Sequence, residues 1–122
     1  MKVMVIVKAT ANSEAGAMPS AELLEGMTKY NDELVKSGIM LAGDGLQPSS
    51  KGKRVHFSGS KRSVVDGPFA ETKEVLAGFN LIEAGSLEEA VRIAQEFPWT
   101  QYGCIEVRPV RDVGAVRQRV GA

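Results

Sequence analysis

The chain has 122 residues, of which 43% are hydrophobic and 25% are charged. This length fits one domain, and the near-average composition excludes collagen-like, coiled-coil and wholly disordered chains. The 15 basic and 15 acidic residues balance, so the chain lacks the cationic surplus of a general nucleic-acid binder, and no net charge repels a second copy.

Cysteine usage and the N-terminal sequence indicate a cytoplasmic protein. Cys104 is the only cysteine, so no disulfide forms within the chain, and a reducing compartment is the simplest setting. Residues 1–7 form an apolar run that is too short for a transmembrane helix and lacks the features of a signal peptide. We therefore expect a cytoplasmic protein that has no membrane partner.

The first half of the chain predicts a strand, a helix and a second strand. Residues 1–8 are rich in Val and Ile, which is typical of a strand buried on both faces, and the small polar residues 9–17 predict a loop. Ser20 is the expected N-cap of a helix that Gly38 ends. Residues 39–42 predict the second strand. The helix carries an apolar stripe of four residues: Leu23, Met27, Tyr30 and Leu34.

The second half predicts a hairpin followed by another strand–helix–strand unit. The predicted elements are residues 54–58 and 63–66 (the hairpin), 75–84 (a strand), 87–97 (a helix) and 104–110 (the last strand). Ser86 and Glu89 form a capping box that opens the helix, and Cys104 is expected in the core. The helix residues expected to point inward are Leu87, Ala90, Val91, Ala94 and Phe97.

This order of elements predicts an α+β fold: a ferredoxin-like sandwich with a β-hairpin insertion and two helices on one face of the sheet. The other face would carry Glu106 and Arg108, with apolar positions such as Ile82 nearby. Such a mixed face is poorly suited to open water. Pairing with a second copy would cover it, so we expect a homodimer.

The most individual stretch of the chain is residues 65–74, VDGPFAETKE. It strongly resembles the signature of the DGPF-containing branch of the YCII-related family. Three further stretches resemble motifs of that family in the expected order, at residues 42–48, 77–83 and 105–110. The resemblance covers nearly all of residues 1–110, which we expect to form the domain, with residues 111–122 as a polar C-terminal tail.

The resemblance implies a ferredoxin-like subunit that pairs as a dimeric α+β barrel, in agreement with the pattern of elements. It implies less about activity, because this branch is largely uncharacterised and its genes are often neighbours of extracytoplasmic-function sigma factors. Related proteins have a His–Asp pair in a cleft. Here the only histidine, His56, lies in the hairpin, and Phe97 stands where many relatives have a histidine before Pro98. These departures argue against histidine-based acid–base chemistry.

The loop after the hairpin contains the candidate catalytic residues, Asp66 and Glu71. Either carboxylate would serve as a general base if burial raised its pKa towards neutrality. Thr72 and Lys73 are placed to hold an anionic or carbonyl-bearing ligand. The structural alternative is that Asp66 turns the chain and Phe69 anchors the loop in the core. Both interpretations stay open.

Three further polar residues outside this loop are candidates for ligand binding. Arg108 would receive a carboxylate or phosphate, or else would form an ion pair across neighbouring strands or at a dimer interface. Gln47 and Asn80 are neutral candidates, although most such amides satisfy backbone groups. The full candidate ligand-binding set is Gln47, Phe69, Thr72, Lys73, Asn80 and Arg108.

A basic cluster surrounds His56 in the hairpin region and consists of Lys51, Lys53, Arg54, Lys61 and Arg62. Because Phe57 is the only aromatic residue among them, the pattern favours a solvated hairpin that resists edge-to-edge pairing over an RNA-binding surface. His56 has no second histidine, and Cys104 is distant in sequence. We therefore expect no metal, no cofactor and no nucleic-acid partner.

Two functions remain open from the sequence. The first is a homodimer that binds a small polar metabolite in a barrel cleft, with weak acid–base catalysis as an option. The second is a non-enzymatic sensor or accessory protein that acts with an extracytoplasmic-function sigma factor, and it rests on the gene neighbourhoods of the family. Whether the protein is an enzyme is left undecided.

Overall fold

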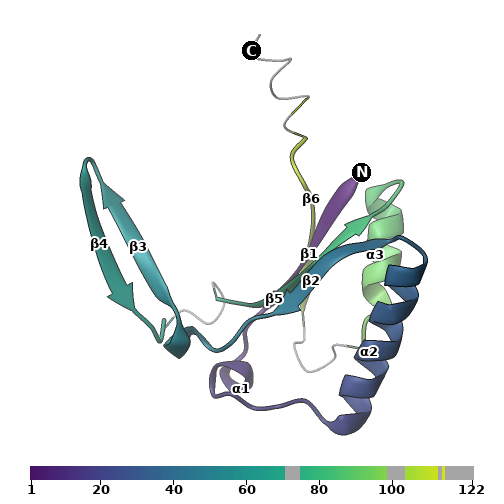
Figure 1. Ribbon diagram of the computed structural model, residues 1–122, viewed down its shortest axis with the longest axis horizontal. Helices are drawn as coiled ribbons and strands as arrows, with labels where there is room; N and C mark the ends of the chain where they lie inside the picture. Colours follow the sequence, from purple (N-terminus) through teal and green to yellow (C-terminus); the bar gives the residue numbers. More distant parts are fainter. Residues whose placement is uncertain (71–74, 99–103, 113, 115–122) are drawn as a thin grey trace.

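The computed structural model describes residues 1–70, 75–98, 104–112 and 114 of the chain. Strands and helices alternate along it, with a hairpin inserted after the second strand (Figure 1). The elements are β1 (Lys2–Lys8), α1 (Ala11–Glu14), α2 (Ala21–Lys36), β2 (Met40–Gly45), the 3₁₀ turn η1 (Ser49–Lys51), β3 (Lys53–Ser58), β4 (Lys61–Asp66), β5 (Leu76–Glu83), α3 (Leu87–Gln95) and β6 (Ile105–Pro109).

Strands β1, β2, β5 and β6 form an antiparallel sheet in the order β2-β5-β1-β6. Two strand–helix–strand units contribute to it, β1–α2–β2 and β5–α3–β6, and each unit is split by a strand of the other. This is the ferredoxin-like arrangement. Strands β3 and β4 pair with each other in a separate two-stranded sheet. The predicted α+β class, with a ferredoxin-like sandwich and an inserted hairpin, is therefore confirmed.

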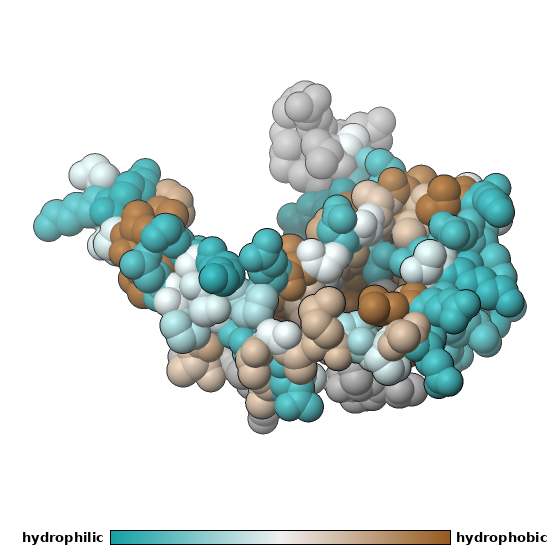
Figure 2. All heavy atoms as spheres, turned by 60° about the horizontal axis from the view of Figure 1, so that its bottom comes forward, coloured by the Kyte–Doolittle hydropathy of each residue, from teal (hydrophilic) through white to brown (hydrophobic). Residues whose placement is uncertain are grey.

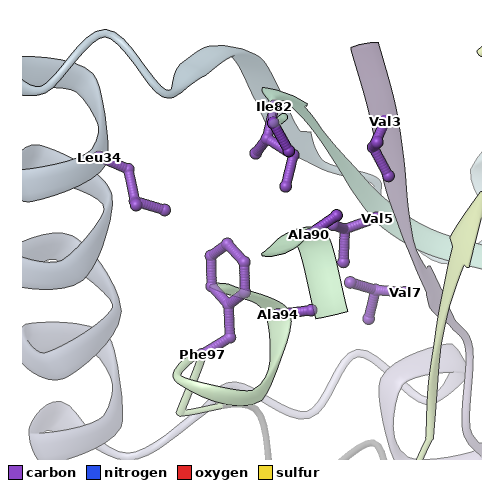
Figure 3. Close-up of a cluster of buried hydrophobic side chains, with 9 residues drawn as sticks. Val3, Val5, Val7, Leu34, Ile82, Ala90, Ala94 and Phe97 are labelled. Carbon is purple, nitrogen blue, oxygen red and sulfur yellow. The ribbon is translucent and has the colours of Figure 1, made fainter. Parts of the chain in front are cut away.

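The core lies between the sheet and the two longer helices. Val3 on β1 and Ile82 on β5 are directly opposite each other, and both are fully buried. Alternate residues of a strand share a face, so the same face of β1 continues through Val5 and Val7. The side chains in Figure 3 that meet in this cluster are Val3, Val5, Val7, Leu34, Ile82, Ala90, Ala94 and Phe97.

Helix α2 begins and ends as its sequence predicts. The Ser20 side chain accepts a hydrogen bond of 3.2 Å from the Leu23 N–H, and Gly38 takes the left-handed φ of 76° that favours glycine after a helix. Tyr30 lies edge-on to Phe97, with ring centroids 4.9 Å apart, and its hydroxyl donates to the Ile93 carbonyl at 2.8 Å. These two contacts join α2 to the end of α3.

Helix α3 confirms half of the predicted capping box. The Ser86 side chain accepts from the Glu89 N–H at 3.1 Å, but the Glu89 carboxylate accepts from the N–H of Gly85 rather than that of Ser86. The prediction that Leu87 and Val91 point inward is wrong, because each is 40% exposed. The buried stripe consists instead of Ala90, Ala94 and Phe97. Leu87 and Val91 therefore lie at the rim of the contact between the helix and the sheet.

The face of the sheet away from the helices is called here the open face. It carries Met4 and Ile6 of β1 and Phe79 and Leu81 of β5, all half-buried. Strand β1 is therefore fully buried on one face only, whereas its Val-rich sequence predicts burial on both. Ile82, expected near the open face, lies in the core because it is opposite Val3.

Two segments outside the sheet also differ from the prediction. The predicted loop at residues 9–17 contains α1, which begins at a capping box between Thr10 and Ser13. The box has serine where glutamate or glutamine is usual, so the sequence does not reveal it. Cys104 precedes β6 and is exposed, not in the core. Among the described residues, no helix is long and apolar enough to span a membrane.

The hairpin of β3 and β4, residues 53–66, is called here the arm. Gly59 takes a φ of 60° in its turn. The arm projects from the body, on the opposite side of the sheet from α2 and α3 (Figure 1). Its predicted strands are confirmed, with β3 beginning one residue earlier and β4 two residues earlier than expected.

Candidate functional site

Two adjacent cavities lie where β2 and β5 approach the base of the arm. The inner cavity has a volume of about 280 Å³ and is lined by residues of β1, α2, β2 and β5. The outer cavity has a volume of about 650 Å³ and is lined by the end of β2, the η1 segment and the chain on either side of the arm. Gly45 lines both cavities, so they adjoin at this residue.

Glycines on the helix-facing side of the sheet make room for the inner cavity. Gly43 and Gly45 of β2 are opposite Asn80 and Gly78 of β5. A Cβ atom added at Gly43 would lie 2.3 Å from the Asn80 Oδ1 atom, which is closer than van der Waals contact allows. Glycine at position 43 is therefore what allows the Asn80 side chain, only 6% exposed, to occupy the wall of this cavity.

A second carboxamide reaches the inner cavity from the helix above it. Asn31 of α2 lines the cavity opposite the sheet, and its Oδ1 atom is buried and accepts no hydrogen bond from the described residues. A buried acceptor that lacks a donor costs about 1–3 kcal/mol, so a bound group that donates to it would be stabilising. Apart from Asp44, the rest of the lining is apolar or glycine and includes Val7, Met27 and Met40.

The outer cavity is held in shape by a hydrogen-bond chain that starts on α1. The Ser49 hydroxyl donates to the Glu14 carboxylate and accepts from the Phe69 N–H at 3.0 Å. The Ser49 N–H donates to the other carboxylate oxygen of Glu14 at 2.8 Å. Ser49 is 7% exposed, so these bonds satisfy a buried polar group and fix the loop after the arm.

The outer cavity is lined by both cationic and aromatic groups. The Arg54 guanidinium lies 3.9 Å from the centroid of the Phe69 ring, which is a cation–π contact. Lys51 and Gln47 also line this cavity. The combination suits a planar or anionic group, which Arg54 and Lys51 would attract and the ring of Phe69 would contact.

The structure brings some of the predicted site residues together and separates others. Gln47 and Phe69 share the outer cavity, and Asn80 lies in the adjoining inner one. Asp66 lies at the base of the arm, exposed and ion-paired with Lys53, and does not line either cavity. The remaining candidates of that loop fall outside the described residues: Glu71, Thr72 and Lys73.

Arg108 lies on the open face, away from both cavities. Its guanidinium is 3.6 Å from the Glu106 carboxylate, which is also 3.5 Å from the Lys8 ammonium on the neighbouring strand. The sequence leaves open whether this charged pair is a ligand site or an ion pair. In the structure, the three residues form a partly exposed ion-pair row along one edge of the sheet.

Two residues of this region are not found by reading the sequence. Asn31 is a polar residue, and the signal that places it towards the sheet is its spacing of four from Met27 and three from Leu34. Glu14 contacts Ser49 across 35 positions of sequence, which no local pattern reveals. Within the described ranges, no three His, Cys, Asp or Glu side chains gather closely enough to hold a metal ion.

The fold and these cavities define the protein as an α+β protein of ferredoxin-like topology with an arm inserted between its two halves. A solved structure with the same overall fold is 5-chloro-2-hydroxyhydroquinone dehydrochlorinase (TftG) from Burkholderia phenoliruptrix AC1100, in complex with 2,5-dihydroxybenzoquinone. The TM-score is 0.50 at 16% sequence identity, and the match covers 91% of this chain and 94% of TftG.

The chain belongs to the YCII-related family, because the model of the YCII-related domain matches residues 1–114. A curated relative is an uncharacterized protein, R00369, of Rhizobium meliloti (strain 1021). The two sequences are 44% identical over 69 residues, which are 53% of this chain and 54% of the relative. The matched segment thus spans about half the length of that relative.

Proposed function

We propose that this protein binds a small polar metabolite in the inner cavity and does so as a homodimer. The observation that carries the proposal is the buried Asn31 Oδ1 atom, which lines this cavity and has no donor among the described residues. Asn80 adds a second carboxamide from the opposite wall. Two amides in a mostly apolar cavity suit a compact molecule with a hydroxyl or N–H group.

The outer cavity adjoins this site and adds two basic side chains to it. Lys51 and Arg54 would attract a carboxylate or phosphate on the same ligand, while Gln47 offers a neutral hydrogen-bonding group. We propose that the ligand's uncharged end occupies the inner cavity and that its polar or anionic end passes Gly45 into the outer one. TftG, a fold neighbour, is described with a hydroxylated quinone, which gives a first class of compounds to try.

Catalysis is a weaker part of the proposal. Asp66 and Glu71 remain the proposed bases, and Thr72, Lys73 and Arg108 the proposed anchors, as the sequence predicts. Asp66 pairs with Lys53 outside the lining of both cavities, so it would have to leave this partner to reach a ligand. Binding therefore stands on more observations than acid–base chemistry does.

The homodimer is supported by the open face. Met4, Ile6, Phe79 and Leu81 form an apolar patch that the helices do not cover, because they pack on the other side of the sheet. Stacking this face on that of a second copy would remove the patch from water and give the dimeric barrel that the family resemblance implies. We also propose that the chain belongs to the DGPF-containing branch of the family, because residues 66–69 read Asp-Gly-Pro-Phe.

The test is a thermal-shift and titration screen with hydroxylated aromatic compounds, including 2,5-dihydroxybenzoquinone, and with small hydroxy acids. Ligand at about 100 times its dissociation constant stabilises the folded state by about 2.7 kcal/mol. We expect Asn31→Leu to weaken binding of any stabilising compound about 5- to 150-fold, because a buried hydrogen bond is lost. Thr28→Leu, on the exposed side of α2, is the matched control and should bind normally.

A compound that stabilises wild type and Asn31→Leu equally would show that the inner cavity is not the site. A screen without any specific stabilisation, together with capture of an extracytoplasmic-function sigma factor, would instead support the accessory-protein hypothesis. Retained binding in Asn31→Leu with loss in Gln47→Ala would move the site to the outer cavity.

A further inference from the structure

The arm is a two-stranded sheet that pairs with no other strand of the described chain. An isolated hairpin is marginally stable in water, and independent stability takes a third strand or packing against another layer. The arm nevertheless extends well away from the body (Figures 1 and 2). Something outside the described chain would therefore stabilise it.

One face of the arm carries exposed apolar side chains between the Lys53–Asp66 ion pair at its base and Arg62 towards its tip. Val55 is opposite Val64, and Phe57 is opposite Arg62, so these four side chains share a face. Their exposures are high for apolar residues: 51% for Val55, 61% for Val64 and 71% for Phe57. The Arg62 guanidinium lies 4.5 Å from the centroid of the Phe57 ring, which leaves most of the ring in water. Figure 2 shows apolar side chains along the arm.

The charge of the arm is complementary to that of the rest of the chain. Residues 53–66 contain four basic residues and one acidic residue, so the arm carries a net charge of +3. Because the whole chain is neutral, the remainder carries −3. On the helical layer the exposed acidic residues outnumber the exposed basic ones, Lys29, Lys36 and Arg92; the acidic residues are Glu22, Glu25, Asp32, Glu33, Glu88 and Glu96. A second copy of the chain thus offers a surface of the opposite sign.

We propose that the apolar face of the arm docks on a second copy of this chain, so that each subunit clasps the other. This inference rests on the homodimer of the proposed function. Since the arm lies on the opposite side of the sheet from the helices, it flanks the side where the open face would seat a partner (Figure 1). The arm contributes Val55, Phe57 and Val64 as the apolar contact. To meet the acidic residues of the partner's helical layer, its basic residues would pass the edge of the partner's sheet.

The experiment measures the dimer dissociation constant by sedimentation equilibrium at low and at high salt. We expect the dimer dissociation constant of V55S/V64S to rise about 10-fold or more, because two apolar contacts are lost. The matched control is H56A/S63A, a cross-strand pair on the opposite face of the arm, which should change the constant less than about 2-fold. Added salt should weaken the wild-type dimer, since it screens exposed charges.

A variant of the open face, Phe79→Glu, separates the two proposals. If it dissociates the dimer while V55S/V64S leaves the constant unchanged, the clasp is wrong and the homodimer of the proposed function stands. A wild type that stays monomeric at the highest concentration measured overturns both. Salt-dependent RNA binding that Phe57→Ser abolishes, with an unchanged dimer, would also overturn the clasp and make the arm a nucleic-acid contact. Thermal unfolding of every variant checks that the body remains folded.

Discussion

The four-stranded sheet and the arm are both antiparallel, and each places a valine opposite another branched apolar residue, Val3 opposite Ile82 and Val55 opposite Val64, yet their environments are opposite. Val3 and Val5 of the sheet are fully buried beneath α2 and α3, whereas Val55 and Val64 of the arm are more than half exposed. The difference lies in what packs over each strand. An alternating β pattern therefore predicts a strand, but it does not say whether the same chain supplies the cover.

The largest expected effect is a difference in unfolding free energy between a substitution in the sheet and one in the arm. Ile82→Ala removes a fully buried side chain from the core and should lower the free energy of unfolding by about 2–5 kcal/mol. Val64→Ala on the arm should change it by less than about 0.5 kcal/mol under conditions where the protein is monomeric. Urea denaturation monitored by circular dichroism measures both. Similar losses in the two variants would show that the arm is already packed within one chain.

Much of the fold follows from the sequence because its signals are local. Ser20 caps α2 and Gly38 ends it, and the Val-rich run of β1 predicts a strand, although it does not tell which of its faces the helices cover. The positions of Leu87 and Val91 are predicted wrongly because several helical registers bury an apolar stripe, and only packing against the sheet selects one. The fold class depends on element order, so it survives such errors.

The candidate site is less predictable, because it depends on contacts between distant segments. Gln47 and Phe69 are found from their motifs and do share a cavity. The inner cavity requires Asn31 on α2 to face Asn80 on β5, and the outer one requires Glu14 to hold Ser49. These pairs lie far apart in the sequence, and no spacing rule links them.

The junction between the sheet and the arm should be the next most sensitive place. A Cβ added at Gly67 would lie 1.8 Å from the Ser49 carbonyl oxygen, a backbone atom that cannot rotate aside. We expect Gly67→Ala to lower the free energy of unfolding by about 1–3 kcal/mol, as other overpacked sites do. It should also weaken ligand binding at the outer cavity, because Ser49 holds Phe69 there.

Gly52→Ala is the matched control for this junction, since its added Cβ would lie at an ordinary 3.5 Å from the same Ser49 oxygen. Chemical denaturation should find Gly52→Ala within about 1 kcal/mol of wild type. Equal stability of the two variants would mean that the loop moves freely, and that the arm is joined to the body more loosely than its hydrogen bonds indicate.

The smallest effect concerns the helical cover that distinguishes the sheet from the arm, and it depends on pH. Burial, and then the negative charges of Glu96 and Glu33, raise the pKa of Tyr30 above its ordinary value of 10.0. The fold thus favours the neutral phenol, which donates to the Ile93 carbonyl. This contribution is complete below the ordinary pKa and is lost as pH rises through the higher pKa of the folded state.

Tyr30→Phe should therefore cost about 1 kcal/mol near neutral pH, because the hydrogen bond between the helices is removed. Above pH 10, wild type should lose stability more steeply than the variant, and the difference between their unfolding free energies should shrink. Urea denaturation of both proteins across neutral and alkaline pH measures this difference, and the contribution of Tyr102, present in both, cancels. A difference that stays constant with pH would mean that the phenol ionises equally easily in the folded and unfolded states. A difference near zero at neutral pH would mean that the α2–α3 contact is held by the rings of Tyr30 and Phe97 alone.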